Sequence, residues 1–139
     1  MTGVQTCALP ISPEAAAFVG LAAHAEVPDY LSAADFAFAT IKPAPCRLFC
    51  SAIKIGEYWA SGLPVLLPPG IGDDSDIVVA EGGGAVFDLE VPATLTAALA
   101  TIQAQLAQPG NRARVPEIAR RHRRLDRAQA AYAALLPPR

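Results

Sequence analysis

The stretch from Ser51 to Pro69 constrains the fold of this chain more than any other, because it reads as a helix, a tight turn and a strand in immediate succession. We predict a short helix over residues 51–61, with Gly62 as the usual left-handed stop after its last turn. The apolar run Val65–Leu67 follows and is too short for a helix, so it indicates a buried strand. This order is the second half of a βαβ crossover, and we therefore expect an α/β fold with a Rossmann-like parallel sheet flanked by helices.

Three polar residues recur at every third position of the predicted helix, so they share one face: Ser51, Lys54 and Glu57. Ser51 lies where the helix is expected to begin, and the free backbone N–H groups of a helix start can hold a phosphate. Lys54 adds a positive charge one turn further along, and Glu57 can accept hydrogen bonds from the hydroxyls of a sugar or ribose. An ordinary solvent-facing helix would show the same spacing, and that alternative stays open.

Composition and charge narrow the functional classes. The chain has 139 residues, of which 53% are hydrophobic and 17% charged, as in a single compact soluble domain. The net charge of −2 argues against a nucleic-acid-binding protein. No apolar run approaches the roughly 20 residues that span a bilayer, and we expect a cytoplasmic location. Cys46 and Cys50 have no second ligand pair nearby, so the sequence does not predict a zinc site. The acidic cluster at residues 73–76 is of a kind that usually faces water, and we therefore expect no bound metal.

Helices and strands alternate on both sides of the central stretch. The expected elements are a strand at 17–21, a helix at 24–35, a strand at 36–41, a short helix from Asp73 or Ser75 to about Ala80, a strand at 85–88 and an amphipathic helix at 92–107. The loop at 42–49 would lie at the carboxyl end of a strand, where open sheets bind ligands. Lys42 and Arg47 are therefore candidate phosphate contacts, with solvated loop cations as the alternative. Gly70 and Gly72 would let the backbone approach a ligand closely, or could simply serve a turn.

The C-terminal segment is strongly basic. Seven of the eleven basic residues lie between Arg112 and Arg127, within one or two predicted helices. Four of them fall at the positions i, i+3, i+4 and i+7, which predicts a basic stripe: Arg120, Arg123, Arg124 and Arg127. Such a stripe would be attracted to an anionic membrane surface, and the alternative is a solvated face of a helix packed along the domain.

Residues 1–11, M-T-G-V-Q-T-C-A-L-P-I, resemble a translated sequencing-adapter tail. A signal peptide is the alternative, but this stretch has no basic n-region and its apolar run covers only Cys7 to Ile11. We exclude these residues from the fold prediction. We expect residues 12–139 to form a partial lobe of a longer gene product.

Residues 57–65, E-Y-W-A-S-G-L-P-V, resemble the donor-binding segment of retaining nucleotide-sugar glycosyltransferases of family 4, where the typical pattern is E-A-M-A-x-G-x-P-V. Residues 51–58 resemble the variant S-P-x-K-x-x-E-Y found in a subgroup. Residues 24–35 resemble the family's e-V-p-x-Y-L run and the a-D that opens its next strand, so the resemblance covers roughly Phe18 to Leu136. Glu57 would be the second Glu of the family's E-x7-E pattern, and Phe49 stands where the first should be.

The resemblance implies an incomplete C-terminal lobe of a GT-B fold, from an enzyme that transfers a sugar from a nucleotide-diphosphate sugar with retained configuration. It implies catalytic roles for Lys54, which would neutralise the leaving diphosphate, and for Glu57, which would position donor hydroxyls. The donor-binding set that it implies is Ser51, Ile53, Glu57, Gly70 and Gly72. No cofactor is implied beyond the donor substrate.

The same resemblance implies partners for the chain. These are the nucleotide sugar, a missing N-terminal acceptor lobe and, through the Arg-rich C-terminal helix, a peripheral membrane contact. The chain alone is expected to be inactive, because catalysis needs donor and acceptor held between two lobes.

Two other classes stay open. A nucleotide-sugar epimerase lobe would need an acid–base set that the sequence does not display. A non-enzymatic α/β regulatory or nucleotide-binding module, such as a phosphoacceptor domain, would need an exposed Asp at a strand end, and Asp35 instead precedes its predicted strand.

Overall fold

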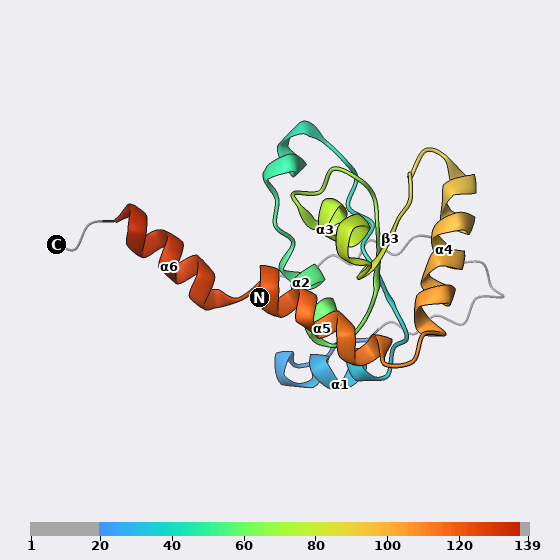
Figure 1. The fold of residues 1–139 in the computed structure, drawn as a ribbon, viewed down its shortest axis with the longest axis horizontal. Helices are drawn as coiled ribbons and strands as arrows, with labels where there is room; N and C mark the ends of the chain where they lie inside the picture. The colour runs from blue at the N-terminus through green and yellow to red at the C-terminus, as the bar shows by residue number, and fades with distance from the viewer. Residues whose placement is uncertain (1–19, 137–139) are drawn as a thin grey trace.

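The computed structural model of the chain describes residues 20–136, and its centre is a three-stranded parallel sheet in the order β1-β2-β3 (Figure 1). The strands are β1 Ala37–Phe38, β2 Val65–Leu67 and β3 Gly84–Val86. In the register of the sheet, Ala37 lies opposite Val65, which in turn lies opposite Gly84. The expected mixed α/β fold with a parallel sheet is confirmed.

Helices connect and cover the strands. They are the 3-10 helices η1 His24–Glu26 and η2 Pro45–Phe49 and the α-helices α1 Val27–Ser32, α2 Ile53–Ala60, α3 Asp74–Glu81, α4 Pro92–Leu106, α5 Asn111–His122 and α6 Leu125–Leu135. Helix α2 connects β1 to β2, and α3 connects β2 to β3, so each pair of neighbouring strands is joined through a helix, as parallel pairing requires.

The two faces of the sheet support separate hydrophobic clusters. Because side chains alternate along a strand, Val65 and Leu67 of β2 point to one face and Leu66 to the other. The first face packs against α2, α3 and α5, where Trp59 is fully buried. The second face packs against α4, whose Ile102 is 1% exposed. The core is therefore a layered sandwich with its central strand buried on both sides.

The turn between α2 and β2 follows the expectation from the sequence. Gly62 has a φ of 78°, and the backbone N–H of Leu63 donates to the carbonyl of Tyr58 over 2.9 Å. This left-handed stop satisfies an end carbonyl of the helix and redirects the chain into β2.

Several boundaries differ from the sequence prediction. Helix α2 begins at Ile53 and not at Ser51, because the backbone of Ala52 is still extended with ψ of 108°. The strand expected at 36–41 is paired only over Ala37–Phe38, and the one expected at 85–88 lies at 84–86. The strand expected at 17–21 and the adapter-like segment fall largely or wholly outside the described residues.

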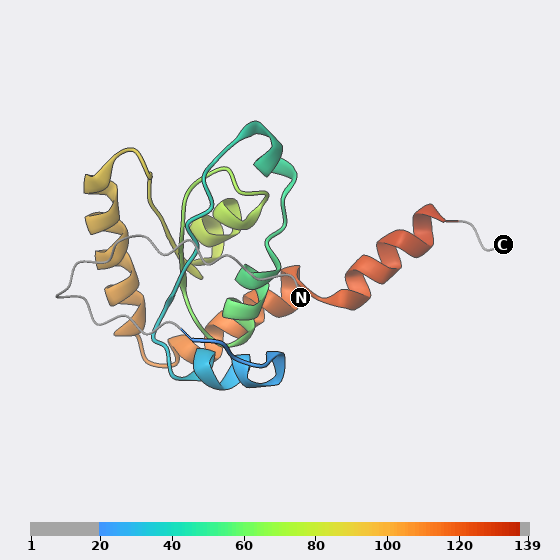
Figure 2. The ribbon, with the colours of Figure 1, turned by 180° about the vertical axis from the view of Figure 1, so that it is seen from behind.

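The C-terminal segment forms two helices with a break at Arg123 and Arg124. Helix α5 packs against α2 and its Val115 and Ile118 are fully buried. Helix α6 buries none of its residues and extends away from the rest of the fold in both views (Figures 1 and 2).

Candidate functional site

The carboxyl edge of the sheet is the natural place for a binding site. The chain leaves each strand at this edge and then enters the N-terminus of the next helix, so the starts of α2, α3 and α4 all follow from it. Open parallel sheets bind ligands at this edge. The segments that reach it are residues 39–52, 68–73 and 87–91.

Helix α2 presents two of the predicted site residues to solvent. Lys54 and Glu57 lie three positions apart and are exposed, whereas Ile55 and Trp59 on the inner side are fully buried. Ile53 is 79% exposed at the start of the same helix. Two of the three residues of the expected polar face, Lys54 and Glu57, therefore lie on the outside of α2.

Ser51 lies outside this helix. It is exposed and precedes the first helical residue by two positions, so its expected place in the first turn was wrong. The first-turn N–H groups belong to Ile53 and Lys54 instead. Five pockets in the described part of the chain are lined by residues other than Ser51, Lys54 and Glu57. Whether these residues bind a donor stays a prediction.

A carboxylate from α3 lies near the start of α2. Asp74 is fully buried and its Oδ1 forms an ion pair with Nη2 of Arg123. Burial raises the pKa of the Asp74 carboxyl, while Arg123 and, to a smaller extent, the backbone of Ala52 oppose that rise. Ala52 is the N-cap of α2 and offers no side-chain cap. The buried Asp74 carboxylate near Ala52 instead places negative charge beside the positive end of the helix dipole.

Arg123 joins this carboxylate to the neighbouring Asp73 and to Trp59 of α2. Its Nη2 lies 2.6 Å from Oδ1 of Asp73, and its guanidinium carbon lies 5.7 Å from the centre of the Trp59 ring. Burial acts to lower the pKa of Arg123, but the hydrogen bonds to Asp73 and Asp74 outweigh it and the pKa is raised. Sequence reasoning missed this cluster, because its members lie about fifty positions apart and only their complementary charges signal it.

The loop between β2 and α3 approaches the chain just before α2. A Cβ on Gly72, which has a φ of +50°, would lie 2.1 Å from the carbonyl oxygen of Cys50. The backbone N–H of Gly72 also donates to the carbonyl of Arg47 over 2.8 Å. Gly72 thus allows two segments of the backbone to pass close together beside Ser51. This is a structural role, in line with the alternative to ligand binding that the sequence left open.

Helix α3 starts close to the expected position, with Asp73 as its N-cap residue. The Asp73 side chain, however, makes no capping hydrogen bond to the helix. The Ser75 hydroxyl instead accepts a hydrogen bond from the backbone N–H of Gly70 over 3.2 Å, which closes the loop. Any role of Gly70 and Gly72 in shaping a donor pocket remains untested.

The loop after β1 separates its two candidate cations. Lys42 lines a pocket together with Asp88 and Glu90, whereas Arg47 lies exposed in η2. Within residues 20–136 no group of three or more His, Cys, Asp or Glu could hold a metal ion. Cys46 and Cys50 are free thiols.

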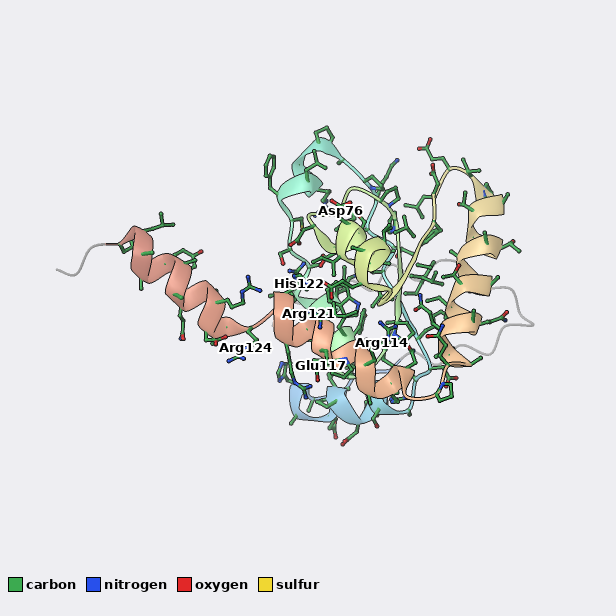
Figure 3. The ribbon with its side chains drawn as sticks, in the orientation of Figure 1. Asp76, Arg114, Glu117, Arg121, His122 and Arg124 are labelled. Carbon is green, nitrogen blue, oxygen red and sulfur yellow. The ribbon has the colours of Figure 1, made fainter. Side chains whose placement is uncertain are left out.

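The basic residues of the C-terminal segment are engaged with the protein itself. Arg114 donates to the carbonyls of Glu81 and Gly82 over 2.9 and 2.8 Å, and Arg121 pairs with the Glu81 carboxylate. Figure 3 shows Arg114, Arg121 and His122 along α5 beside α3. The prediction of a single basic stripe was wrong. Helix α5 ends at His122, and the side chain of Arg123 points inward to Asp74.

Membrane contact through this segment remains an untested prediction. In the part of the chain that the structure describes, no helix combines the length and apolar character needed to cross a bilayer.

Comparison with known proteins adds no relative: no protein family model, no curated protein and no solved structure matches this chain. The resemblance to family 4 glycosyltransferases therefore depends on the motif residues alone.

Proposed function

We propose that this chain is part of the donor-binding lobe of a retaining glycosyltransferase that uses a nucleotide-diphosphate sugar. The observation that carries the proposal is the exposed polar face of α2, with Lys54 and Glu57 on a helix that starts at the carboxyl edge of a parallel sheet. The same helix ends in the Gly62 turn into the central strand, as the family motif requires.

In this proposal the diphosphate lies on the exposed side of the start of α2. The N–H groups of the first turn and the ammonium group of Lys54 would hold it and neutralise charge on the leaving group. Asp74 lies on the buried side, where Arg123 balances its charge, so the net repulsion of an incoming phosphate is reduced. Glu57 would accept hydrogen bonds from donor hydroxyls one turn further along.

Transfer itself would need a second lobe that brings an acceptor to the bound donor. We therefore propose donor binding, and not turnover, as the property to test on this chain.

Calorimetric titration of the 139-residue chain with UDP, GDP and inorganic pyrophosphate tests the proposal. Lys54→Met should weaken both nucleotide and pyrophosphate binding by about tenfold, the effect expected for loss of a charge-assisted contact. Glu57→Gln should weaken nucleotide binding but leave pyrophosphate binding unchanged, because only the nucleotide carries hydroxyls.

The matched controls are Arg120→Met and Glu117→Gln, which make the same charge changes on the exposed face of α5. They should leave every titration unchanged. Absence of heat with all three probes, from protein with a folded circular dichroism spectrum, would reject donor binding by this chain.

A further inference from the structure

The carboxyl ends of all three strands border a pocket of about 490 Å³ that contains no residue of α2. Its lining is contributed by the segments that follow the strands: Lys42 and Pro43 after β1, Pro69 after β2, and Asp88, Leu89 and Glu90 after β3. This volume lies in the range of roughly 300–1,000 Å³ that is usual for small-molecule sites. We call it the strand-end pocket.

The acidic wall of this pocket is held in place by hydrogen bonds. The backbone N–H of Asp88 donates to the hydroxyl oxygen of Thr94 over 2.8 Å, and that hydroxyl donates to the carbonyl of Val91 over 2.7 Å. The backbone N–H of Glu90 donates to Oδ1 of Asp88 over 2.8 Å. The segment 88–91 is thereby fixed against the first turn of α4, and a ligand would meet a prearranged surface.

The charged side chains that line the pocket form no ion pairs within the described residues. Among residues 20–136, the ion pairs involve neither Lys42 nor Asp88 nor Glu90. The pocket therefore presents one ammonium group, which can donate, and two carboxylates, which can accept. Its formal charge of −1 disfavours phosphates and other anions.

Hydroxyl groups match this set, because each can accept from an ammonium and donate to a carboxylate. The two proline rings and the Leu89 side chain supply apolar wall against which the C–H face of a ring can pack. We propose that the strand-end pocket binds an uncharged polyhydroxylated ring of monosaccharide size. This inference does not depend on donor binding at α2, since the two sites share no residue.

The test is a titration of the full ¹⁵N-labelled chain, followed by amide chemical shifts, with glucose, galactose, N-acetylglucosamine and, as a separate probe, inorganic phosphate. At least one sugar should shift the amides of Lys42 and of residues 88–90, with an affinity on the order of millimolar. Phosphate should leave these amides in place.

Glu90→Ala and Lys42→Ala should each weaken the sugar's binding at least about fivefold, as expected for loss of one hydrogen-bonding partner. Both side chains are exposed, so the variants should fold. Glu117→Ala and Arg120→Ala on α5 are the matched controls and should bind like the unsubstituted chain.

The proposal is overturned if no sugar shifts these amides, if phosphate shifts them as a sugar does, or if the pocket variants bind as tightly as the controls. A nucleoside diphosphate that shifts only the amides of residues 51–57 would support binding at α2, and it would not count as evidence for the strand-end pocket. The two proposals can therefore fail separately.

Discussion

Arg123 lies at the end of α5, and its guanidinium contacts carboxylates of the segment that starts α3 and the ring of Trp59 on α2. Its side chain is 16% exposed, and that of Asp74 is fully buried. A buried carboxylate that loses its cation is far more costly than a broken surface pair, because neither water nor another charge compensates it. This single arginine therefore links three helices through one charged cluster.

Replacing Arg123 with Ala should lower the free energy of unfolding by about 3 kcal/mol, because Asp74 would remain buried without its partner. Arg120→Ala is the control on the same helix: its pair with Glu117 is exposed, so we expect a loss of less than about 1 kcal/mol. Urea denaturation followed by circular dichroism measures both. Equal midpoints for the two variants would show that the cluster contributes no more than a surface pair.

Glu81 should make stability depend on acid pH. Hydrogen bonds from Arg121 and His122 lower the pKa of its carboxyl from the ordinary value of 4.5. A lowered pKa in the folded state stabilises the fold fully above the unfolded value, and this contribution is lost as the pH falls through the folded value. The gap in unfolding free energy between the unsubstituted chain and Glu81→Gln should therefore narrow from about pH 6 to about pH 3. A gap that stayed constant over that range would contradict the assignment.

At the scale of elements, the junction of α2 and β2 depends on a glycine for two separate reasons. Gly62 has a φ of +78°, and a Cβ there would lie 2.6 Å from the carbonyl oxygen of Arg112. Gly110 has nearly the same φ, +77°, but a Cβ there would meet nothing within 4 Å. Substitutions at Gly62 and Gly110 therefore separate two contributions to the free energy of unfolding, the strain of the backbone conformation and the steric clash of a new Cβ.

Gly110→Ala should cost about 1 kcal/mol, the usual penalty for a left-handed conformation. Gly62→Ala should cost at least about 2 kcal/mol, because α5 must also move away from α2. Thermal and urea denaturation of both variants provide the comparison. Equal losses would mean that α5 shifts without cost and that only the backbone conformation matters.

Elements with local signals were predicted closely from the sequence. Helix α4 begins at Pro92 as expected, since proline fits the first turn, and β2 occupies the expected Val65–Leu67 between a Gly-Leu-Pro turn and a pair of prolines. The start of α2 was misplaced because it depends on distant segments. The backbone of Gly72 lies against the segment just before Ile53, where its N–H donates to the carbonyl of Arg47, and spacing within residues 51–57 carries no information about this contact.

The same contrast between local signals and contacts of distant segments applies to the candidate sites. The outward face of Lys54 and Glu57 could be predicted, because residues three apart share one side of a helix. The strand-end pocket joins Lys42 to Asp88 and Glu90, more than forty positions away, and only the parallel order of the sheet brings them together. Arg47 was proposed beside Lys42 on loop position alone, and it is absent from the pocket lining.

At the scale of the whole molecule, the described chain consists of a layered body and one helix outside it (Figure 2). Helix α6 has exposed apolar side chains, including Leu125, Tyr132 and Leu135, at 72%, 66% and 77% exposure. An isolated helix of this length is only marginally stable in water, and α6 has no buried face whose packing would stabilise it further. The body, in contrast, has both faces of β2 buried.

The stability of the body should therefore be independent of α6. Truncation after Arg124 keeps Arg123 and its cluster, and it should leave the urea midpoint unchanged while reducing the helical circular dichroism signal, because no residue of α6 is buried. Ile118→Ala, which empties a fully buried position of α5, is the contrasting variant and should cost about 3 kcal/mol. If truncation lowered the midpoint as much as Ile118→Ala does, α6 would have to pack against the body in solution, and its exposed apolar side chains would be part of the core.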